Sequence, residues 1–272
     1  MITRIEIIFY FAAALMLWGC SSVPYTGRKH MLLVSESEEV KMGDESYAAV
    51  LKSSKLSADA EKTALVRRVG ARLAKVSDAP PQFKWEFNLI EDEKQINAFC
   101  LPGGKVAVYT ALLPVAKDEA GLAVVMGHEI AHALARHGSE RMSQGMAAGI
   151  GSKILSVALS NKTPEVQGAF SKAYGVGMNV GVMLPFSRSH ESEADHIGLI
   201  LMAKAGYDPA AALTFWDKFG KLGSNSRLKE LLSTHPVGEK RIQELKDFYP
   251  KAMEYYKKAP VKRGLGEIYS QR

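Results

Sequence analysis

Residues 124–132 have the sequence Val124-Val125-Met126-Gly127-His128-Glu129-Ile130-Ala131-His132. The stretch is apolar apart from two histidines and one glutamate, and it contains no proline, so it predicts a buried helix. Histidines four residues apart lie one turn above each other on the same helix face, where both imidazoles can bind one metal ion. A helix that only packs in a core has no reason to carry these three polar side chains.

The residue types in this stretch indicate metal-assisted hydrolysis. A catalytic zinc ion has three protein ligands and one open position, and His128 and His132 supply two of the three. Glu129 follows the first ligand and projects beside the metal, where it can accept a proton from bound water. Two histidines and a carboxylate also bind other divalent ions, so zinc, at one Zn²⁺ per chain, is inferred from the ligand set.

The third ligand must come from another part of the chain. The candidates are four histidines and one acidic segment: His137, His190, His196, His235 and Glu191-Ser192-Glu193-Ala194-Asp195. Glu191 and Asp195 share a helix face, so Glu191 can bind the metal while Asp195 accepts a hydrogen bond from a ligand histidine. The alternative is an acidic helix start in solvent, capped by Ser189.

The segments around the motif predict an α+β fold, a mainly helical domain with a small antiparallel sheet, over residues 36–250. Three segments have strand character, residues 85–90, 96–101 and 105–110, and Pro102-Gly103-Gly104 predicts a tight turn between the last two. From Ala111 onward the pattern is helical almost to the end. Two apolar segments, 145–160 and 174–186, are shorter than a transmembrane helix requires.

The N-terminus predicts an export signal in residues 1–20, followed by a tether in residues 21–35. An apolar run follows Arg4 and ends at Gly19-Cys20. This ending resembles the lipobox of bacterial lipoproteins, which implies lipidation of Cys20 and a membrane attachment. The alternative is a plain signal peptide or membrane anchor with an incidental cysteine. With Cys20 acylated, only Cys100 remains, so no internal disulfide forms.

The composition is that of an ordinary globular protein, with 47% hydrophobic and 24% charged residues and a net charge of +6. No dense basic stripe with interleaved aromatic residues is present in the sequence, which excludes a nucleic-acid groove. The basic C-terminal tail, residues 251–272, suits either weak attraction to an anionic lipid surface or a solvated terminus.

The motifs in combination resemble metallopeptidase family M48. The resemblance covers roughly residues 23–245 and is carried by His128-Glu129-x-x-His132, Arg136-His137 and Ser187-Arg188-x-x-Glu191-x-Glu193-Ala194-Asp195-x-x-Gly198. Two further segments, Pro24-x-Thr26-Gly27-Arg28 and Asn97-Ala98 followed by Pro102-Gly103-Gly104, are similar to the periplasmic lipoprotein branch of the family.

The resemblance implies a zincin-like (gluzincin) fold and a role for each residue that matches the family motif. The implied metal ligands are His128, His132 and Glu191, the general base is Glu129, and Asp195 orients a ligand. His235 is implied to face the metal, where it either caps the ion or polarises the substrate carbonyl. The implied substrate-binding residues are Asn97, Ala98 and Arg188.

The resemblance also implies a zinc endopeptidase for protein quality control, acting on unfolded or misassembled envelope proteins such as outer-membrane proteins. Its expected location is the periplasmic side of a bacterial membrane, and Ser21 and Ser22 after the lipidated cysteine favour the outer membrane. Three alternatives stay open. They are a chaperone-like assembly factor with a capped, rarely active zinc site, a closed structural zinc site, and another zinc hydrolase such as an amidase.

Overall fold

The computed structural model describes residues 20–145, 187–221, 235–236 and 238–264 of the 272-residue chain. The predicted signal segment before Cys20 and the two apolar segments, apart from Gly145, lie outside the described residues. The chain divides into two compact units, one of residues 1–36 and 136–184 and one of residues 37–135 and 185–272. No helix in the described part of the chain is both long and apolar enough to cross a membrane.

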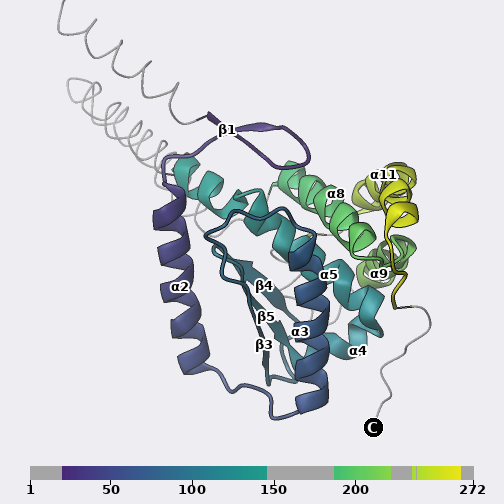
Figure 1. The fold of residues 1–272 in the computed structure, drawn as a ribbon, viewed down its shortest axis with the longest axis horizontal. Helices are drawn as coiled ribbons and strands as arrows, with labels where there is room; N and C mark the ends of the chain where they lie inside the picture. Colours follow the sequence, from purple (N-terminus) through teal and green to yellow (C-terminus); the bar gives the residue numbers. More distant parts are fainter. Residues whose placement is uncertain (1–19, 146–186, 222–234, 237, 265–272) are drawn as a thin grey trace, which may run out of the picture. The chain divides into compact units, whose positions relative to one another are not determined.

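The larger unit contains most of the helices and one sheet (Figure 1). In chain order its elements are α2 (Glu36–Ser53, which starts at the unit boundary), α3 (Ala60–Lys75), β3 (Glu86–Ile90), β4 (Ala98–Leu101), β5 (Lys105–Tyr109), the 3-10 turn η1 (Thr110–Leu112), α4 (Leu113–Ala116), α5 (Glu119–Leu134), α8 (Arg188–Lys204), α9 (Ala210–Lys221) and α11 (Glu239–Lys258). The predicted mainly helical α+β fold is confirmed. The last helix continues past residue 250, into the segment that we predicted as a basic tail.

The sheet has the strand order β3-β5-β4 and is mixed, which corrects the prediction of a purely antiparallel sheet. Strands β4 and β5 form the predicted antiparallel hairpin, whereas β3 runs parallel to β5. Strand β5 lies between β3 and β4, which run in opposite directions. It is therefore parallel to β3 and antiparallel to β4. The hairpin turn needs Gly103 and Gly104, whose φ angles of +83° and +82° are readily adopted only by glycine.

Helices α2 and α3 cover opposite faces of this sheet (Figure 1). Tyr47 of α2 packs on Ile90 and Ala107, and its hydroxyl donates to the carbonyl of Val106 at 2.7 Å. On the other face Phe87 fills the space above Gly70 of α3, where an added Cβ would lie 2.3 Å from the phenyl ring. The sheet is thus held rigidly, with β4 at its edge and α5 alongside β4.

Helix α5 carries the motif with which the sequence analysis began, and every one of its residues is buried. Its first turn is capped by Asp118, whose carboxylate accepts from the backbone N–H of Gly121 at 2.8 Å. Helix α8 is capped by Ser187 rather than Ser189, because the Ser187 hydroxyl accepts from the N–H of His190. The cap therefore starts α8 two residues earlier than the sequence suggested.

Two glycines allow α5 and α8 to approach each other closely. A Cβ added to Gly198 would lie 3.0 Å from the backbone nitrogen of His128, and one added to Gly127 would lie 3.2 Å from the carbonyl oxygen of Gly198. Such contacts are tighter than most packed side chains make, so a larger residue at either position would push the two helices slightly apart. The close crossing brings the polar residues of the two helices to one place.

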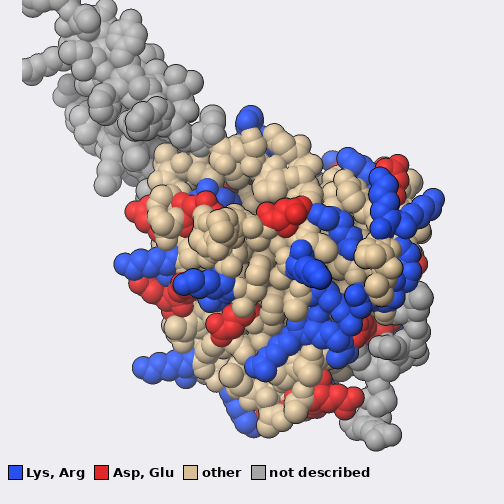
Figure 2. Space-filling view, in the orientation of Figure 1, with Lys and Arg blue, Asp and Glu red and all other residues tan. Residues whose placement is uncertain are grey.

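A buried ion-pair cluster ties α3, α5 and the turn after α8 together. Glu119, 3% exposed, accepts from Arg68 and Arg72 of α3 and from the hydroxyl of Tyr207. Figure 2 shows Lys and Arg side chains gathered over α3. The exposed basic residues of this helix are Lys62, Arg67, Arg68 and Lys75. Burial alone would raise the pKa of Glu119, but the hydrogen bonds and charge of Arg68 and the charge of Arg72 lower it below its usual value.

We expect Glu119→Gln to destabilise the protein by about 1–2 kcal/mol at neutral pH, discounted because Arg68 is nearly half exposed. The folded-state pKa of Glu119 is lowered, so its contribution is present above the unfolded pKa of about 4.3 and is lost as the pH falls through the folded value. Urea unfolding of wild type and variant at neutral pH and at about pH 3.5 measures this. The difference should shrink in acid, and equal stability at neutral pH would contradict the expectation. Glu61→Gln, on the exposed start of α3, is the control.

The smaller unit contains a two-stranded antiparallel ribbon, β1 (Cys20–Ser22) with β2 (Lys29–Met31), and helical residues 137–145. The turn between β1 and β2 is closed by a hydrogen bond from the N–H of Gly27 to the carbonyl of Val23. Arg28 donates two hydrogen bonds to Glu140, at 2.9 and 2.7 Å. The segment predicted as a tether is thus folded against residues 137–145. Lipidation of Cys20 stays a prediction.

Candidate metal centre

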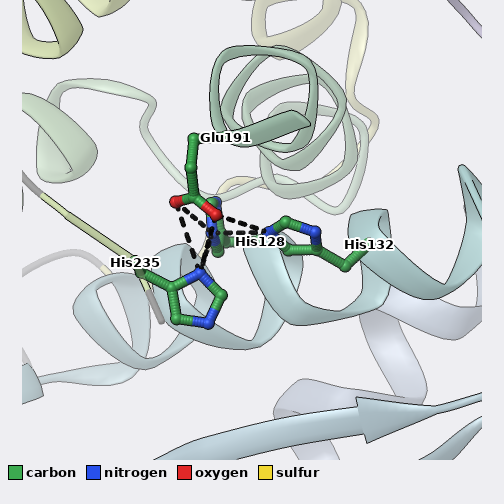
Figure 3. A group of neighbouring side chains, drawn as sticks. All are labelled: His128, His132, Glu191 and His235. Carbon is green, nitrogen blue, oxygen red and sulfur yellow. Dashed lines mark hydrogen bonds and ion pairs between the residues drawn. The ribbon is translucent and has the colours of Figure 1, made fainter. Parts of the chain in front are cut away.

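Four buried side chains from three parts of the larger unit converge on one point (Figure 3). His128 and His132 come from adjacent turns of α5, Glu191 comes from the first turn of α8, and His235 precedes α11. One nitrogen or oxygen from each lies within 4.8 Å of the others, and none of the four residues is more than 4% exposed. The structure therefore brings together the three predicted ligands and the further histidine, His235, that the sequence analysis singled out.

The spacing of these atoms fits a small tetrahedral ion. Nε2 of His132 lies 3.1 Å from Nε2 of His128, which lies 3.2 Å from Nδ1 of His235. Glu191 Oε1 is 3.3 Å from His132 Nε2 and 3.0 Å from His235 Nδ1. Ligands about 2.0–2.1 Å from a tetrahedral zinc ion are about 3.3 Å apart, so these four separations are close to the edges of such a site.

The chemistry of the donors fits a cation as well. His128 Nδ1 lies 2.8 Å from Asp195 Oδ1, so the ring donates its Nδ1 proton to that carboxylate. Its Nε2 then carries a lone pair that points at the other three side chains. Several lone pairs that face one another in a buried site repel unless a cation lies between them. Asp195 therefore lies where the sequence analysis expected it, within hydrogen-bond distance of a histidine of the converging group.

The sequence analysis assigned no role to two residues that contact this centre, Arg241 and Trp216. Arg241 donates from Nε and Nη2 to the two oxygens of Asp195, at 2.6 and 2.8 Å. The ring of Trp216 lies 3.9 Å from the guanidinium carbon and packs edge-on against His128. An arginine six residues after His235 and a tryptophan on an amphipathic helix give no local signal of such contacts.

The electrostatics of the centre favour a bound cation. Burial would raise the pKa of Glu191, yet hydrogen bonds from His128, His132 and His235 hold it well below its usual value. Burial would lower the pKa of His128, but the charge of Asp195 raises it to about 9. The excess of negative charge that holds a proton there also holds a divalent ion, which competes with that proton.

Glu129 lies next to the ligand set without belonging to it. It is 5% exposed, and its Oε1 has no hydrogen-bond partner among the described residues. Nε2 of His235 lies 3.4 Å from that oxygen. Burial raises the pKa of Glu129 above its usual value. A buried carboxylate with a raised pKa, and with an oxygen that makes no hydrogen bond, is suited to accept a proton.

Comparison with known proteins places this centre in a family. Residues 60–248, which include all four converging side chains, match the model of peptidase family M48. The chain belongs to peptidase family M48. As an M48 protein it is a metallopeptidase, and its substrates are polypeptides.

Three M48 relatives illustrate the similarity. The mitochondrial metalloendopeptidase OMA1 of Schizosaccharomyces pombe is 36% identical over 253 residues, which cover 92% of this chain and 70% of that protein. OMA1 of Arabidopsis thaliana is 44% identical over 162 residues, 59% of this chain and 31% of that protein. The beta-barrel assembly-enhancing protease of Escherichia coli K12 is 30% identical over 234 residues, 84% of this chain and 47% of that protein. The chain thus spans less than half the length of the last two.

The predicted location, the periplasmic side of a bacterial membrane and more likely the outer membrane, is wrong. M48 relatives from yeasts, a plant and vertebrates are named as mitochondrial enzymes, and they contradict it. The prediction rested on an apolar run that ends in Gly19-Cys20. Such a run is short and unspecific, because any apolar N-terminal segment with one cysteine at its end satisfies it.

The predicted substrate-binding residues lie at two places in the M48 domain. Asn97 and Ala98 lie at the start of the edge strand β4, where the carbonyl of Asn97 accepts from the N–H of Tyr109. Arg188 is the exposed first residue of α8. Strand β4 packs along α5, the helix that carries Glu129. Burial, with the charge of Glu129 as a smaller cause, raises the pKa of the Cys100 thiol on this strand.

The remaining candidate histidines lie outside the converging group. His137 and His190 are buried elsewhere, and the ring of His196 stacks on Phe248 at 4.1 Å. Among the described residues, Cys100 has no disulfide partner.

Proposed function

We propose that this chain is a zinc-dependent endopeptidase that cleaves unfolded or misassembled polypeptides. The observation that carries the proposal is the buried tetrahedral group of His128, His132, Glu191 and His235 with the free oxygen of Glu129 beside it. Three nitrogens and one carboxylate oxygen at tetrahedral spacing suit zinc better than magnesium or calcium, which take oxygen ligands in larger numbers.

In this mechanism His128, His132 and Glu191 hold the ion, and Asp195 fixes the tautomer and ring angle of His128. Bound zinc lowers the pKa of water from ~15.7 to about 7 and polarises a carbonyl group. Glu129 takes a proton from the attacking water and returns it to the leaving amine nitrogen, which balances the proton in hydrolysis. The free Oε1 of Glu129 is the atom that would carry it.

The preference for unfolded chains follows from the edge strand. Among the described strands, none pairs with β4 on the side away from β5, so its backbone can pair with an extended peptide. Asn97 and Ala98 would contact such a peptide, and Arg188 would bind its acidic groups. Only an unfolded or loosely folded chain offers an extended segment. We leave envelope proteins out of this proposal because the location they presuppose is contradicted.

Hydrolysis of unfolded casein tests the proposal, with a tightly folded protein of similar size as the second substrate. We expect cleavage of casein at internal peptide bonds, mapped by mass spectrometry, and at least tenfold slower cleavage of the folded protein. If protein that contains zinc cleaves neither casein nor the folded protein, the proposal is contradicted.

A second function has one observation in its favour. Nδ1 of His235 takes the fourth corner of the tetrahedron, where a catalytic site has water. A site closed in this way is structural or resting, as in a chaperone-like factor that rarely cleaves. We propose that His235 is a removable cap, which reconciles a closed site with the presence of Glu129.

We expect His235→Ala to raise casein hydrolysis, about tenfold if nine molecules in ten are capped at rest. The reason is that alanine frees the fourth position while leaving the three ligands in place. Initial rates at equal zinc content measure the effect, with the exposed Lys240→Ala as the control. A fall of tenfold or more would instead assign His235 to polarising the substrate carbonyl.

A further inference from the structure

Arg241 is a buried cation that contacts three separate parts of the metal centre. It lies in the first turn of α11 and is 7% exposed. Its Nε and Nη2 donate to both oxygens of Asp195, and its Nη1 lies 2.8 Å from Oε2 of Glu191. Nη1 also donates to the carbonyl of Pro236, at 3.2 Å. One guanidinium thus joins α8 to the residue that follows His235.

The plane of this guanidinium is fixed by Trp216. The ring lies 3.9 Å from the guanidinium carbon, and the same ring packs edge-on against His128 at 5.4 Å. Trp216 is itself 2% exposed and is held by Phe215 and Phe219. A planar group with several donors can be oriented in this way, whereas the ammonium of a lysine cannot.

The charge of Arg241 resolves a conflict between two neighbouring carboxylates. Glu191 and Asp195 lie one helical turn apart on α8, and both are buried. Two carboxylates this close together in a buried site repel each other unless a cation lies beside them. Arg241 contacts both and supplies that cation.

The contact also fixes the direction in which the Glu191 carboxylate points. Arg241 binds Oε2, which lies 3.5 Å from His128 Nε2 and 3.3 Å from His235 Nδ1. The other oxygen, Oε1, lies 3.3 Å from His132 Nε2 and 3.0 Å from His235 Nδ1. We propose that Arg241 is a positioning residue that holds the carboxylate of Glu191 toward the metal and, through the carbonyl of Pro236, seats His235 over the same point. The proposal rests on the metal centre of the proposed function.

Arg241→Lys tests this, because lysine keeps the charge but cannot reach three acceptors at once. We expect a 10- to 100-fold weaker zinc affinity by chelator competition, the usual cost of losing a partner of a metal ligand. The visible absorption spectrum of the Co²⁺-substituted protein should change, because the carboxylate of Glu191 and the ring of His235 are then held less firmly at the metal.

Two further variants keep the test decisive. Lys240→Gln, at the exposed neighbouring position, should match wild type in affinity and spectrum. Trp216→Phe keeps an aromatic ring but narrows the surface under the guanidinium. It should therefore shift the cobalt spectrum in the same direction as Arg241→Lys. This variant replaces Arg241→Lys in the test if Arg241→Lys does not fold. Zinc affinity within twofold of wild type and an unchanged cobalt spectrum in the folded variants would overturn the proposal.

Both main measurements are made without substrate. A chain that binds zinc but cleaves nothing would contradict the proposed function while leaving the role of Arg241 testable. A chain that cleaves polypeptides, but whose zinc affinity and cobalt spectrum do not change in Arg241→Lys, would contradict the role of Arg241 and leave the proposed function standing.

Discussion

Replacement of Glu129 by glutamine is expected to lower casein hydrolysis by at least about 100-fold, and up to about 10⁴-fold, while leaving zinc binding intact. Glutamine has the shape of glutamate but cannot take a proton from water. Glu129 is not among the four converging ligands, so the metal should stay. Hydrolysis and zinc content are measured on the same preparation. Retention of more than a tenth of the wild-type rate would contradict the role of base.

The same residue predicts the acid limb of the pH profile. Glu129 must be ionised to accept a proton, and its pKa is raised mainly by burial. Hydrolysis should therefore begin to fall at a higher pH than the usual glutamate value of about 4.3 would give. Rates of casein hydrolysis measured from neutral pH downward give the midpoint of this fall, which should lie above about 4.3.

Replacement of Glu191 by alanine should have the other large effect, loss of both metal and hydrolysis. Loss of a residue that only supports a metal ligand typically weakens metal affinity 10- to 100-fold. Removal of a ligand itself should therefore weaken it more than about 100-fold. It also leaves Arg241 without one of its acceptors in a buried site. Zinc affinity by chelator competition and casein hydrolysis check the expectation.

Glu193→Ala is the matched control for Glu191→Ala. Glu193 lies two residues along the same helix and is also buried, but it is outside the converging group. A general loss of folding would affect both variants, whereas loss of a ligand affects only Glu191→Ala. Glu191→Ala protein that retains one tightly bound zinc would show that the ligand assignment is wrong.

The parts of the site that could be predicted from the sequence are those that depend on spacing along one helix. His128 and His132 on α5, and Glu191 and Asp195 on α8, each lie one turn apart, and periodicity alone places each pair on one face. The apolar surroundings of the first pair predicted its burial. The turn at Gly103 and Gly104 was predicted for a similar reason, because its conformation is local.

The features that the sequence did not predict depend on contacts between distant segments. Arg241 and Trp216 meet the metal centre only because α9 and α11 pack against α8 and α5. The parallel pairing of β3 with β5 depends on strand order, which no local pattern specifies. His235 lies outside the described helices and strands, so no periodicity places it and only a family resemblance indicated its position.

Removal of the metal and its stepwise return test the central claim most directly. Wild-type protein is treated with a chelator, dialysed and titrated with Zn²⁺, and zinc content and casein hydrolysis are measured at each step. The account predicts that hydrolysis disappears with the metal and returns in proportion, complete at about one zinc ion per chain. Undiminished hydrolysis by protein without bound metal would contradict it.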